Sequence, residues 1–145
     1  MYLIDTNVIS ETRKISAGKA DPNVARWAFE TPSGENFISV ITVHEIVKGI
    51  KLLAKRDPLR AEILERWLEE TVIREFTGRI LAIDEKIARI AGALHVPDPR
   101  PQLDALIAAT ALVHSLTLAT RNTADFEPMG VPLFNPWATE PARRR

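Results

Sequence analysis

The chain has 145 residues, of which 46% are hydrophobic, so it can bury the core of one compact domain and has no room for a second. It contains no cysteine, which excludes disulfides, thiolate metal sites and cysteine nucleophiles and leaves oxygen and histidine as possible metal ligands. Lysine plus arginine and aspartate plus glutamate number 19 each, so the composition does not predict the broadly basic surface of a protein that holds nucleic acid by charge alone.

Apolar periodicity predicts strands that alternate with helices. Helix starts are indicated at Asp21 and Asp57, each followed by proline, and at Asp84. In chain order, the pattern predicts a strand at 2–4, helices at 8–14 and 22–30, a strand at 37–40, helical structure across 43–70, a strand at 79–83, a helix from 84 to 93, an apolar helix at 103–113 and strands at 116–120 and 131–134. This alternation predicts an α/β fold, a three-layer α/β/α sandwich with a mainly parallel central sheet whose ligands bind at the carboxyl ends of the strands.

Two acidic residues are predicted near such strand ends. Asp5 follows the first strand, and Asn122 and Asp125 lie in the loop after the strand at 116–120. An ordinary structural use is open for both acids, because Asp5 could cap the next helix and Asp125 could belong to a turn.

Two further acidic residues are predicted in first helical turns. Thr42 and Glu45 have the spacing of a capping box, which by itself favours a structural role for Glu45. Asp104 is well placed to interact with a helix dipole, but the apolar helix that follows it must be buried, and a carboxylate at a buried helix end needs a partner or a metal ion.

Four short motifs carry a family resemblance: MYLIDTNVIS at the start, Glu45 after a short strand, LDALIAATAL in the apolar helix and LATRNTADF near the end. Their order and spacing resemble the PIN-domain family, in particular the VapC-type and FitB-like toxins of bacterial toxin–antitoxin pairs. The resemblance implies one PIN domain over residues 1–137, and the arginines near the end of the sequence indicate a flexible basic tail at 138–145. It implies catalytic, metal-binding carboxylates supported by polar side chains: Asp5, Glu45, Asp104 and Asp125 as the acids, with Thr6, Asn7, Thr120 and Asn122 as the supports.

The activity implied by the resemblance is hydrolysis of RNA phosphodiester bonds with one or two Mg²⁺ or Mn²⁺ ions. It also implies a toxin, expected to be a homodimer, that is silenced by a small antitoxin, expected to bind DNA, with the helices at 22–30 and 43–70 as partner surfaces. Physical chemistry agrees on the ions, since two carboxylates about 4 Å apart repel by roughly 4 kcal/mol at an effective dielectric near 20, and all-oxygen ligands favour hard cations. Without a long apolar run or a signal-peptide pattern, we expect a soluble, cytoplasmic protein.

Several alternatives remain open at this point. A catalytically silent PIN-like binding module is one, and a phosphatase with Asp5 as nucleophile is another, although Asn7 stands where that chemistry usually has a second acid. The lysines at positions 48, 51 and 55 are expected to form a solvated helix face, with a basic path for RNA phosphates as the alternative. His44 is a possible neighbour of the site.

Overall fold

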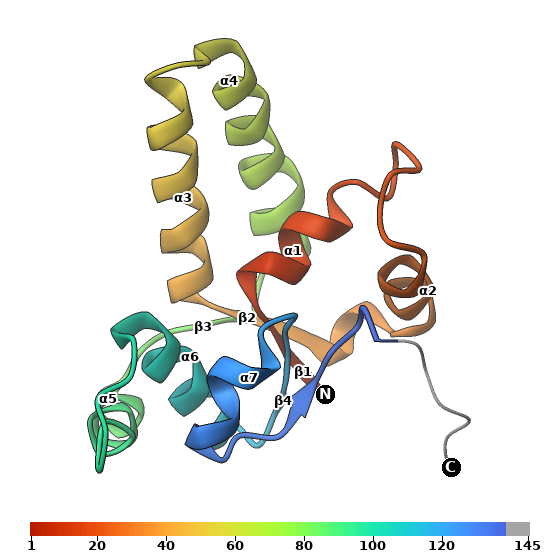
Figure 1. The fold of residues 1–145 in the computed structure, drawn as a ribbon. Helices are drawn as coiled ribbons and strands as arrows, with labels where there is room; N and C mark the ends of the chain where they lie inside the picture. Colours follow the sequence, from red (N-terminus) through yellow and green to blue (C-terminus); the bar gives the residue numbers. More distant parts are fainter. Residues whose placement is uncertain (139–145) are drawn as a thin grey trace.

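The structure, a computed structural model, describes residues 1–138. Five strands form a sheet in which every pairing is parallel, in the order β3-β2-β1-β4-β5 (Figure 1). The strands are β1 (Tyr2–Ile4), β2 (Asn36–Ser39), β3 (Ile80–Leu81), β4 (Thr117–Ala119) and β5 (Leu133–Phe134). All five lie within or beside the segments predicted as strands, but the strand expected at 79–83 is reduced to two residues. The expected mainly parallel sheet is confirmed.

Helices fill most of the chain between the strands. They are α1 (Thr6–Thr12), α2 (Pro22–Glu30), α3 (Val40–Ala54), α4 (Pro58–Trp67), α5 (Glu85–Ala93), α6 (Gln102–Val113) and α7 (Thr123–Phe126), with 3₁₀ turns at Ser33–Glu35 and Glu127–Met129. A π-helical segment, Leu68–Ile73, continues α4. None of the helices in the described part of the chain is long and apolar enough to cross a membrane.

Consecutive residues of β1 belong to two different core clusters, one on each face of the sheet, which gives the molecule its three layers. Leu3 packs with Leu118 into a cluster that includes Ile87 from α5 and Ile107 from α6. Its neighbour Ile4 lies in the other cluster, with residues from α1, α3 and α4. Side chains of a strand alternate between faces, so a parallel sheet covered on both sides needs apolar residues at consecutive positions.

The predicted helix starts at Asp21, Asp57 and Asp84 are confirmed by their capping hydrogen bonds. The carboxylate of Asp21 accepts from the backbone N–H of Asn23 at 2.9 Å, that of Asp57 from Arg60 at 3.2 Å and that of Asp84 from Ile87 at 2.9 Å. Each bond satisfies one of the N–H groups that a first helical turn leaves without a partner.

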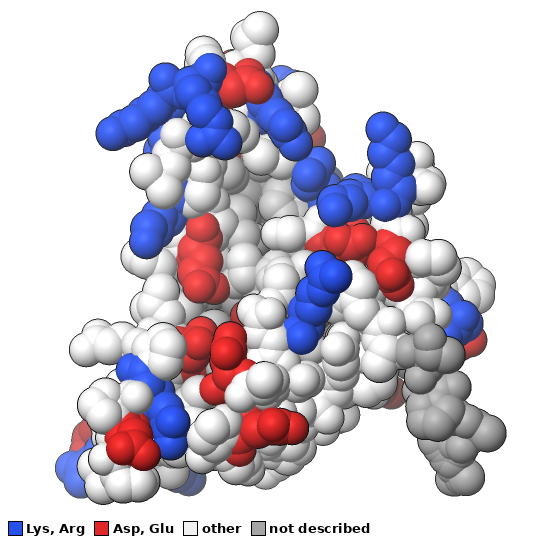
Figure 2. All heavy atoms as spheres, viewed as in Figure 1, with Lys and Arg blue, Asp and Glu red and all other residues white. Residues whose placement is uncertain are grey.

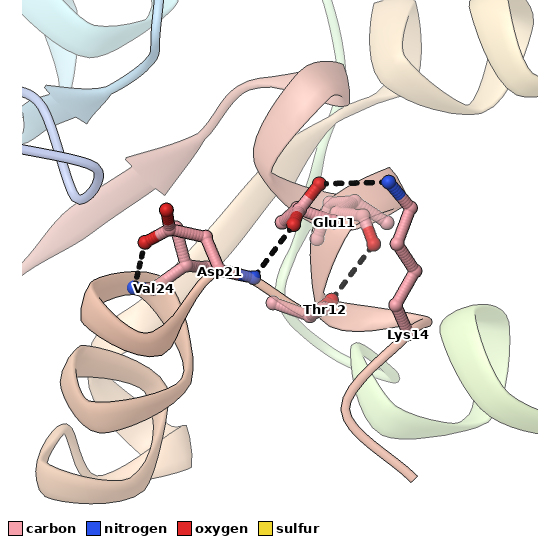
Figure 3. A network of polar contacts seen from close by, with 6 residues as sticks. Glu11, Thr12, Lys14, Asp21 and Val24 are labelled. Atoms are coloured by element: carbon pink, nitrogen blue, oxygen red, sulfur yellow. Dashed lines mark hydrogen bonds and ion pairs between the residues drawn. The ribbon is translucent and has the colours of Figure 1, made fainter. Parts of the chain in front are cut away.

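A polar network ties the end of α1 to the start of α2 (Figure 3). The carboxylate of Glu11 accepts a hydrogen bond from the backbone N–H of Asp21 at 2.8 Å and pairs with Lys14 at 3.1 Å. The bond from Asp21, followed by the bond and charge of Lys14 and the charge of Arg121, lowers the pKa of Glu11 despite some desolvation. The network fixes the connection that leads away from the first strand.

The helices α3 and α4 form a hairpin that rises from the edge of the sheet where the strands end (Figure 1). Its inner face is apolar, since Ile46 and Ile50 of α3 and Ala61 of α4 are buried in one core cluster. Its tip carries exposed hydrophobic side chains, with Leu52, Leu59 and Ile63 each more than half exposed. The hairpin therefore projects a long surface beside the carboxyl ends of the strands.

Candidate active site

Asp5 lies at the end of the central strand, where its side chain is fixed by two neighbouring segments. It follows β1 directly and is buried, and its Oδ1 accepts a hydrogen bond from the backbone N–H of Thr6 at 2.8 Å. Its Oδ2 accepts from the hydroxyl of Thr120, which follows β4, at 2.7 Å. The register that pairs Ile4 with Ala119 brings these two residues together although they are 115 positions apart. Asp5 is thus both the N-cap of α1 and part of a site built across two strands.

Asn7 and Asn122 support this arrangement in different ways. The amide nitrogen of Asn7 lies 3.4 Å from both Asp5 Oδ2 and Thr120 Oγ1, and its Oδ1 accepts from the backbone N–H of Arg121 at 3.2 Å. Asn122 contributes its backbone N–H, which donates to the Thr120 hydroxyl at 3.0 Å, while its side chain is exposed. The side-chain amide of Asn7 therefore links the ends of β1 and β4.

Glu45 does not belong to a capping box, and the predicted position in a first helical turn is wrong. Helix α3 begins at Val40, and its cap is Ser39, whose hydroxyl accepts from the backbone N–H of Ile41 at 2.9 Å. Glu45 consequently lies in the second turn, where its carboxylate accepts a hydrogen bond from the Thr6 hydroxyl. Because Ser39 caps α3, helix capping does not explain the presence of Glu45.

Thr42 is a buried neighbour that the sequence analysis had assigned to the cap. Its hydroxyl oxygen lies 3.4 Å from that of Thr6. Thr6 has a single hydroxyl proton, and its contact with Glu45 is much the shorter of the two, so this proton serves Glu45. Thr42 therefore lies beside the contact between Thr6 and Glu45 and does not cap the helix.

Asp104 lies in the first turn of α6, and its side chain is partly buried. The cap position before it is Pro101, which makes no side-chain capping bond. The pKa of Asp104 is raised, first by burial and then by the charges of Asp5, Asp125 and Glu45. Burial also raises the pKa of Asp5 against the opposing effect of its hydrogen bonds from Thr120 and Thr6, with a further contribution from Glu45.

Asp125 lies in the short helix α7, not in the loop that was expected there, and its side chain is exposed. Its effect on Asp104 places it in the same electrostatic neighbourhood as the other acids. Asp5, Glu45, Asp104 and Asp125 thus come from β1's end, α3, α6 and α7. His44 is exposed, and its side chain makes no hydrogen bond to another of the described residues.

The chemistry of the four carboxylates suits binding of a hard divalent cation. Among residues 1–138, none of the four acids pairs with a lysine, arginine or histidine. Their oxygens are the donors that Mg²⁺ and Mn²⁺ prefer, and like charges that raise each other's pKa are neutralised by protons or by cations. As they stand, no three acidic or histidine side chains of the described residues are close enough to enclose a metal ion. The residues present therefore match the cation in chemistry, while closure around it requires the side chains to adjust.

A groove of about 380 Å³ begins at this acidic group and runs between α1 and the α3–α4 hairpin. Figure 2 shows acidic side chains near the base of the hollow and basic side chains around its upper rim. Thr6 and Glu45 line its acidic end, and its other lining includes Arg13, Arg56 and Arg60. These three arginines were not predicted from the sequence, because they have no common spacing and line one groove only when α1 packs beside the hairpin.

The expected solvated face at Lys48, Lys51 and Lys55 is confirmed, since all three side chains are exposed. None of them lines the groove that begins at Glu45. Lys51 lies on the opposite side of the hairpin, 3.9 Å from the carboxylate of Glu65. The alternative of a basic path made by these lysines is therefore not supported by their positions.

Fold and site together define an α/β/α protein with a carboxylate cluster at the carboxyl ends of its central parallel strands, a class suited to chemistry that uses divalent cations. The chain belongs to the PIN-domain family, whose PIN domain profile matches residues 2–130. The family predicted from the sequence motifs is thereby confirmed.

Individual relatives match the chain over nearly its whole length. Toxin FitB of Neisseria gonorrhoeae is 36% identical over 142 residues, which cover 94% of this chain and 99% of the relative. VapC ribonuclease Y4jK of Sinorhizobium fredii is 35% identical over 147 residues, covering 98% of this chain and 100% of the relative. The crystal structure of FitAcB from Neisseria gonorrhoeae superposes with a TM-score of 0.85 at 35% identity, covering 96% of this chain and 100% of that one.

Proposed function

We propose that the chain is a divalent-cation-dependent endoribonuclease that acts as the toxin of a toxin–antitoxin pair. The observation that carries the proposal is the hydrogen-bonded placement of Asp5 at the end of β1 and of Glu45 on α3, where Thr6 bonds to both through its backbone N–H and its hydroxyl. The pKa of Asp104 supports it, since burial raises this pKa first and the charges of Asp5, Asp125 and Glu45 raise it further. The names of the relatives support it, since one is a toxin and another a VapC ribonuclease. The intact set of acids speaks against a silent binding module.

In this proposal Asp5, Glu45, Asp104 and Asp125 hold one or two Mg²⁺ or Mn²⁺ ions. When bound, such ions supply the Lewis acidity that activates a water molecule and stabilises negative charge on the scissile phosphate. Asp5 is held in one rotamer by its bonds from Thr120 and the Thr6 backbone, so it offers a fixed direction to a ligand.

The polar supports keep the ligands in place. Thr6 orients the Glu45 carboxylate, and Thr120 and Asn7 orient Asp5. Asn122 acts through the backbone bond to Thr120, which leaves its exposed side chain free to contact RNA. A 1 Å loss of position at such ligands is costly in catalysis, so these neutral residues belong to the machinery although they carry no charge.

The proposal includes a small antitoxin partner, expected to bind DNA, and a homodimer, with α2 and the α3–α4 hairpin as partner surfaces. Exposed apolar side chains on these elements support this use. Phe29 of α2 is 91% exposed, and Leu59 of α4 is 76% exposed. Burial of these side chains by a partner would remove their apolar surface from water. The single domain predicted at 1–137 stays part of the proposal, and the predicted tail at 138–145 lies, from residue 139 onward, outside the described residues.

The test is cleavage of a labelled single-stranded RNA by the purified protein with Mg²⁺ or Mn²⁺, with and without EDTA. Cleavage that EDTA abolishes, and that Asp5→Asn and Asp104→Asn both remove, is expected. Equal cleavage in all samples would contradict the metal mechanism. A folded wild type that neither cleaves RNA nor binds the cations by calorimetry would instead support the silent binding module.

A further inference from the structure

We propose that the groove between α1 and the α3–α4 hairpin binds the phosphate backbone of the substrate strand to one side of the scissile bond, through Arg13, Arg56 and Arg60. This inference rests on the proposed ribonuclease function and assigns the path of its substrate. The groove is continuous with the carboxylate cluster, because Thr6 and Glu45 line the same space as the three arginines. A strand whose scissile phosphate lies at the acids would have its neighbouring phosphates in this groove.

The arginines carry charge that the protein itself does not balance. None of the three pairs with a carboxylate among residues 1–138, and Arg56 and Arg60 are exposed. Arg13 is half-buried and lies over the ring of Trp67, with its guanidinium carbon 5.9 Å from the ring centroid. Three guanidinium groups around one hollow raise its potential for anions, and their planar donors suit phosphate oxygens.

The direction of the groove suits a polymer better than a mononucleotide. An α-helix rises 1.5 Å per residue, so the end of α3 at Ala54, next to Arg56, lies on the order of 15 Å from Glu45. That reach spans several nucleotides of a strand. Arg13 follows the C-terminal end of α1 and lines the groove from that side. The RNA strand would then lie between α1 and the hairpin.

The composition did not predict this RNA path, because the positive and negative charges of the whole chain are equal in number. The protein has no net charge, yet Glu45 lines one end of the groove and three arginines line the rest of it. Once cations occupy the acidic end, both ends attract phosphate. A neutral chain can therefore hold RNA by a local arrangement of charge.

The test compares two double variants that remove the same charge from the same type of residue. Arg56→Gln with Arg60→Gln removes two groove arginines, and Arg66→Gln with Arg74→Gln is the matched control, since both of these arginines are exposed and neither lines the groove. Binding of a fluorescein-labelled single-stranded RNA is followed by anisotropy in EDTA, with Asp104→Asn added to every protein so that the RNA stays intact. Cleavage of the same RNA is then followed with Mg²⁺ in the proteins that retain Asp104.

The groove variant should bind RNA roughly fivefold to tenfold more weakly than the control at low salt, as expected for the loss of two exposed ion pairs. The slope of log affinity against log salt should fall by about 1.4, because each phosphate contact on a single strand contributes about 0.7. Its KM for cleavage should rise while kcat stays close to the control value. Quenching of Trp67 fluorescence by RNA, absent in Trp67→Phe, should report binding in the groove itself.

Equal affinity and equal salt slope in the two double variants would overturn the groove assignment, and an acidic protein segment would then be the remaining partner for these arginines. This result is distinguishable from failure of the ribonuclease proposal, because the binding assay does not require cleavage. If the wild type cleaves RNA and the groove variant cleaves with an unchanged KM, the groove assignment is wrong and the ribonuclease function stands. If the wild type does not cleave but RNA affinity depends on the groove arginines, the groove assignment stands and the nuclease proposal fails.

Discussion

Replacing Asp104 by asparagine should stabilise the protein in the absence of divalent cations and abolish its RNA cleavage. The side chain is partly buried at the start of α6, and its negative charge is opposed by burial and by three other carboxylates. Asparagine keeps the shape and removes the charge. Replacing a cation ligand is expected to raise stability while it removes activity. Replacing a residue that serves only the fold would lower stability and activity together.

The magnitude follows from the repulsion between the acids. Two carboxylates about 4 Å apart at an effective dielectric near 20 repel by roughly 4 kcal/mol, and solvent at this partly exposed site screens most of that energy. We therefore expect Asp104→Asn to raise the free energy of unfolding by about 0.5–1 kcal/mol in EDTA, which shifts Tm upward by about 1–4 °C in a domain of this size. Asp98→Asn, in the exposed loop before α6, is the matched control and should leave Tm unchanged.

The pH dependence gives the same prediction with a defined sign. The folded-state pKa values of Asp5 and Asp104 are raised above their ordinary value of 3.8, so the folded protein retains protons there that the unfolded chain has lost. Their contribution to stability is complete below that value and is lost as the pH rises through the folded-state pKa. In EDTA, the stability advantage of Asp104→Asn over wild type should therefore grow as the pH is raised from about 3.8 toward neutrality, and it should be absent at lower pH.

Thermal unfolding of wild type, Asp104→Asn and Asp98→Asn in EDTA and in Mg²⁺ measures these effects. Mg²⁺ should raise the Tm of wild type and of the control but not that of Asp104→Asn, since a ligand stabilises only the protein that binds it. A lower Tm for Asp104→Asn in EDTA would refute the reasoning, because it would mean that the charge at position 104 stabilises α6. The structural use as a helix-dipole partner would then be the correct one.

Three further outcomes follow from the site and its surroundings. Glu45→Gln should lose cleavage with a Tm within about 2 °C of wild type, since Ser39 caps α3; a larger drop would restore a structural role. Thr120→Val should lower the free energy of unfolding in urea by about 1.5–3 kcal/mol through loss of the bond to Asp5, and an unchanged midpoint would contradict that bond. Glu11→Gln should destabilise the fold at neutral pH and cease to do so in acid, because the lowered pKa of Glu11 makes its contribution vanish as the pH falls; a pH-independent difference would exclude this.

Local chemistry was sufficient to predict the alternation of strands and helices and the positions of Asp5 and Asp104. Both positions can be predicted from a few neighbouring residues, because periodicity and capping depend on near neighbours. Asp5 follows the end of a strand, and Asp104 lies at the start of an apolar helix. The same holds for the helix starts at Asp21 and Asp84, where the carboxylate bonds to a backbone N–H two or three positions away.

Glu45 shows where local chemistry failed. Ser39 and Thr42 both offer a hydroxyl near the start of α3, and the spacing of Thr42 to Glu45 favoured the wrong one. The parallel pairing of β2 with β1 and β3 extends the strand to Ser39 and starts the helix at Val40, which carries Thr42 and Glu45 onward to face Thr6. Long-range strand pairing decided which hydroxyl became the cap.

What the sequence by itself determined is the family and the fold, and it predicted the set of acids, since these lie in ordered motifs along the chain. Only the tertiary structure decided how they are supported and what lies beside them. The hydroxyl of Thr120 reaches Asp5 across 115 positions, and Arg13 and Arg60 line one groove because α1 packs beside the hairpin. The positions of such residues follow from the packing of whole elements, whose geometry depends on both cores at once and leaves no periodic mark on the chain.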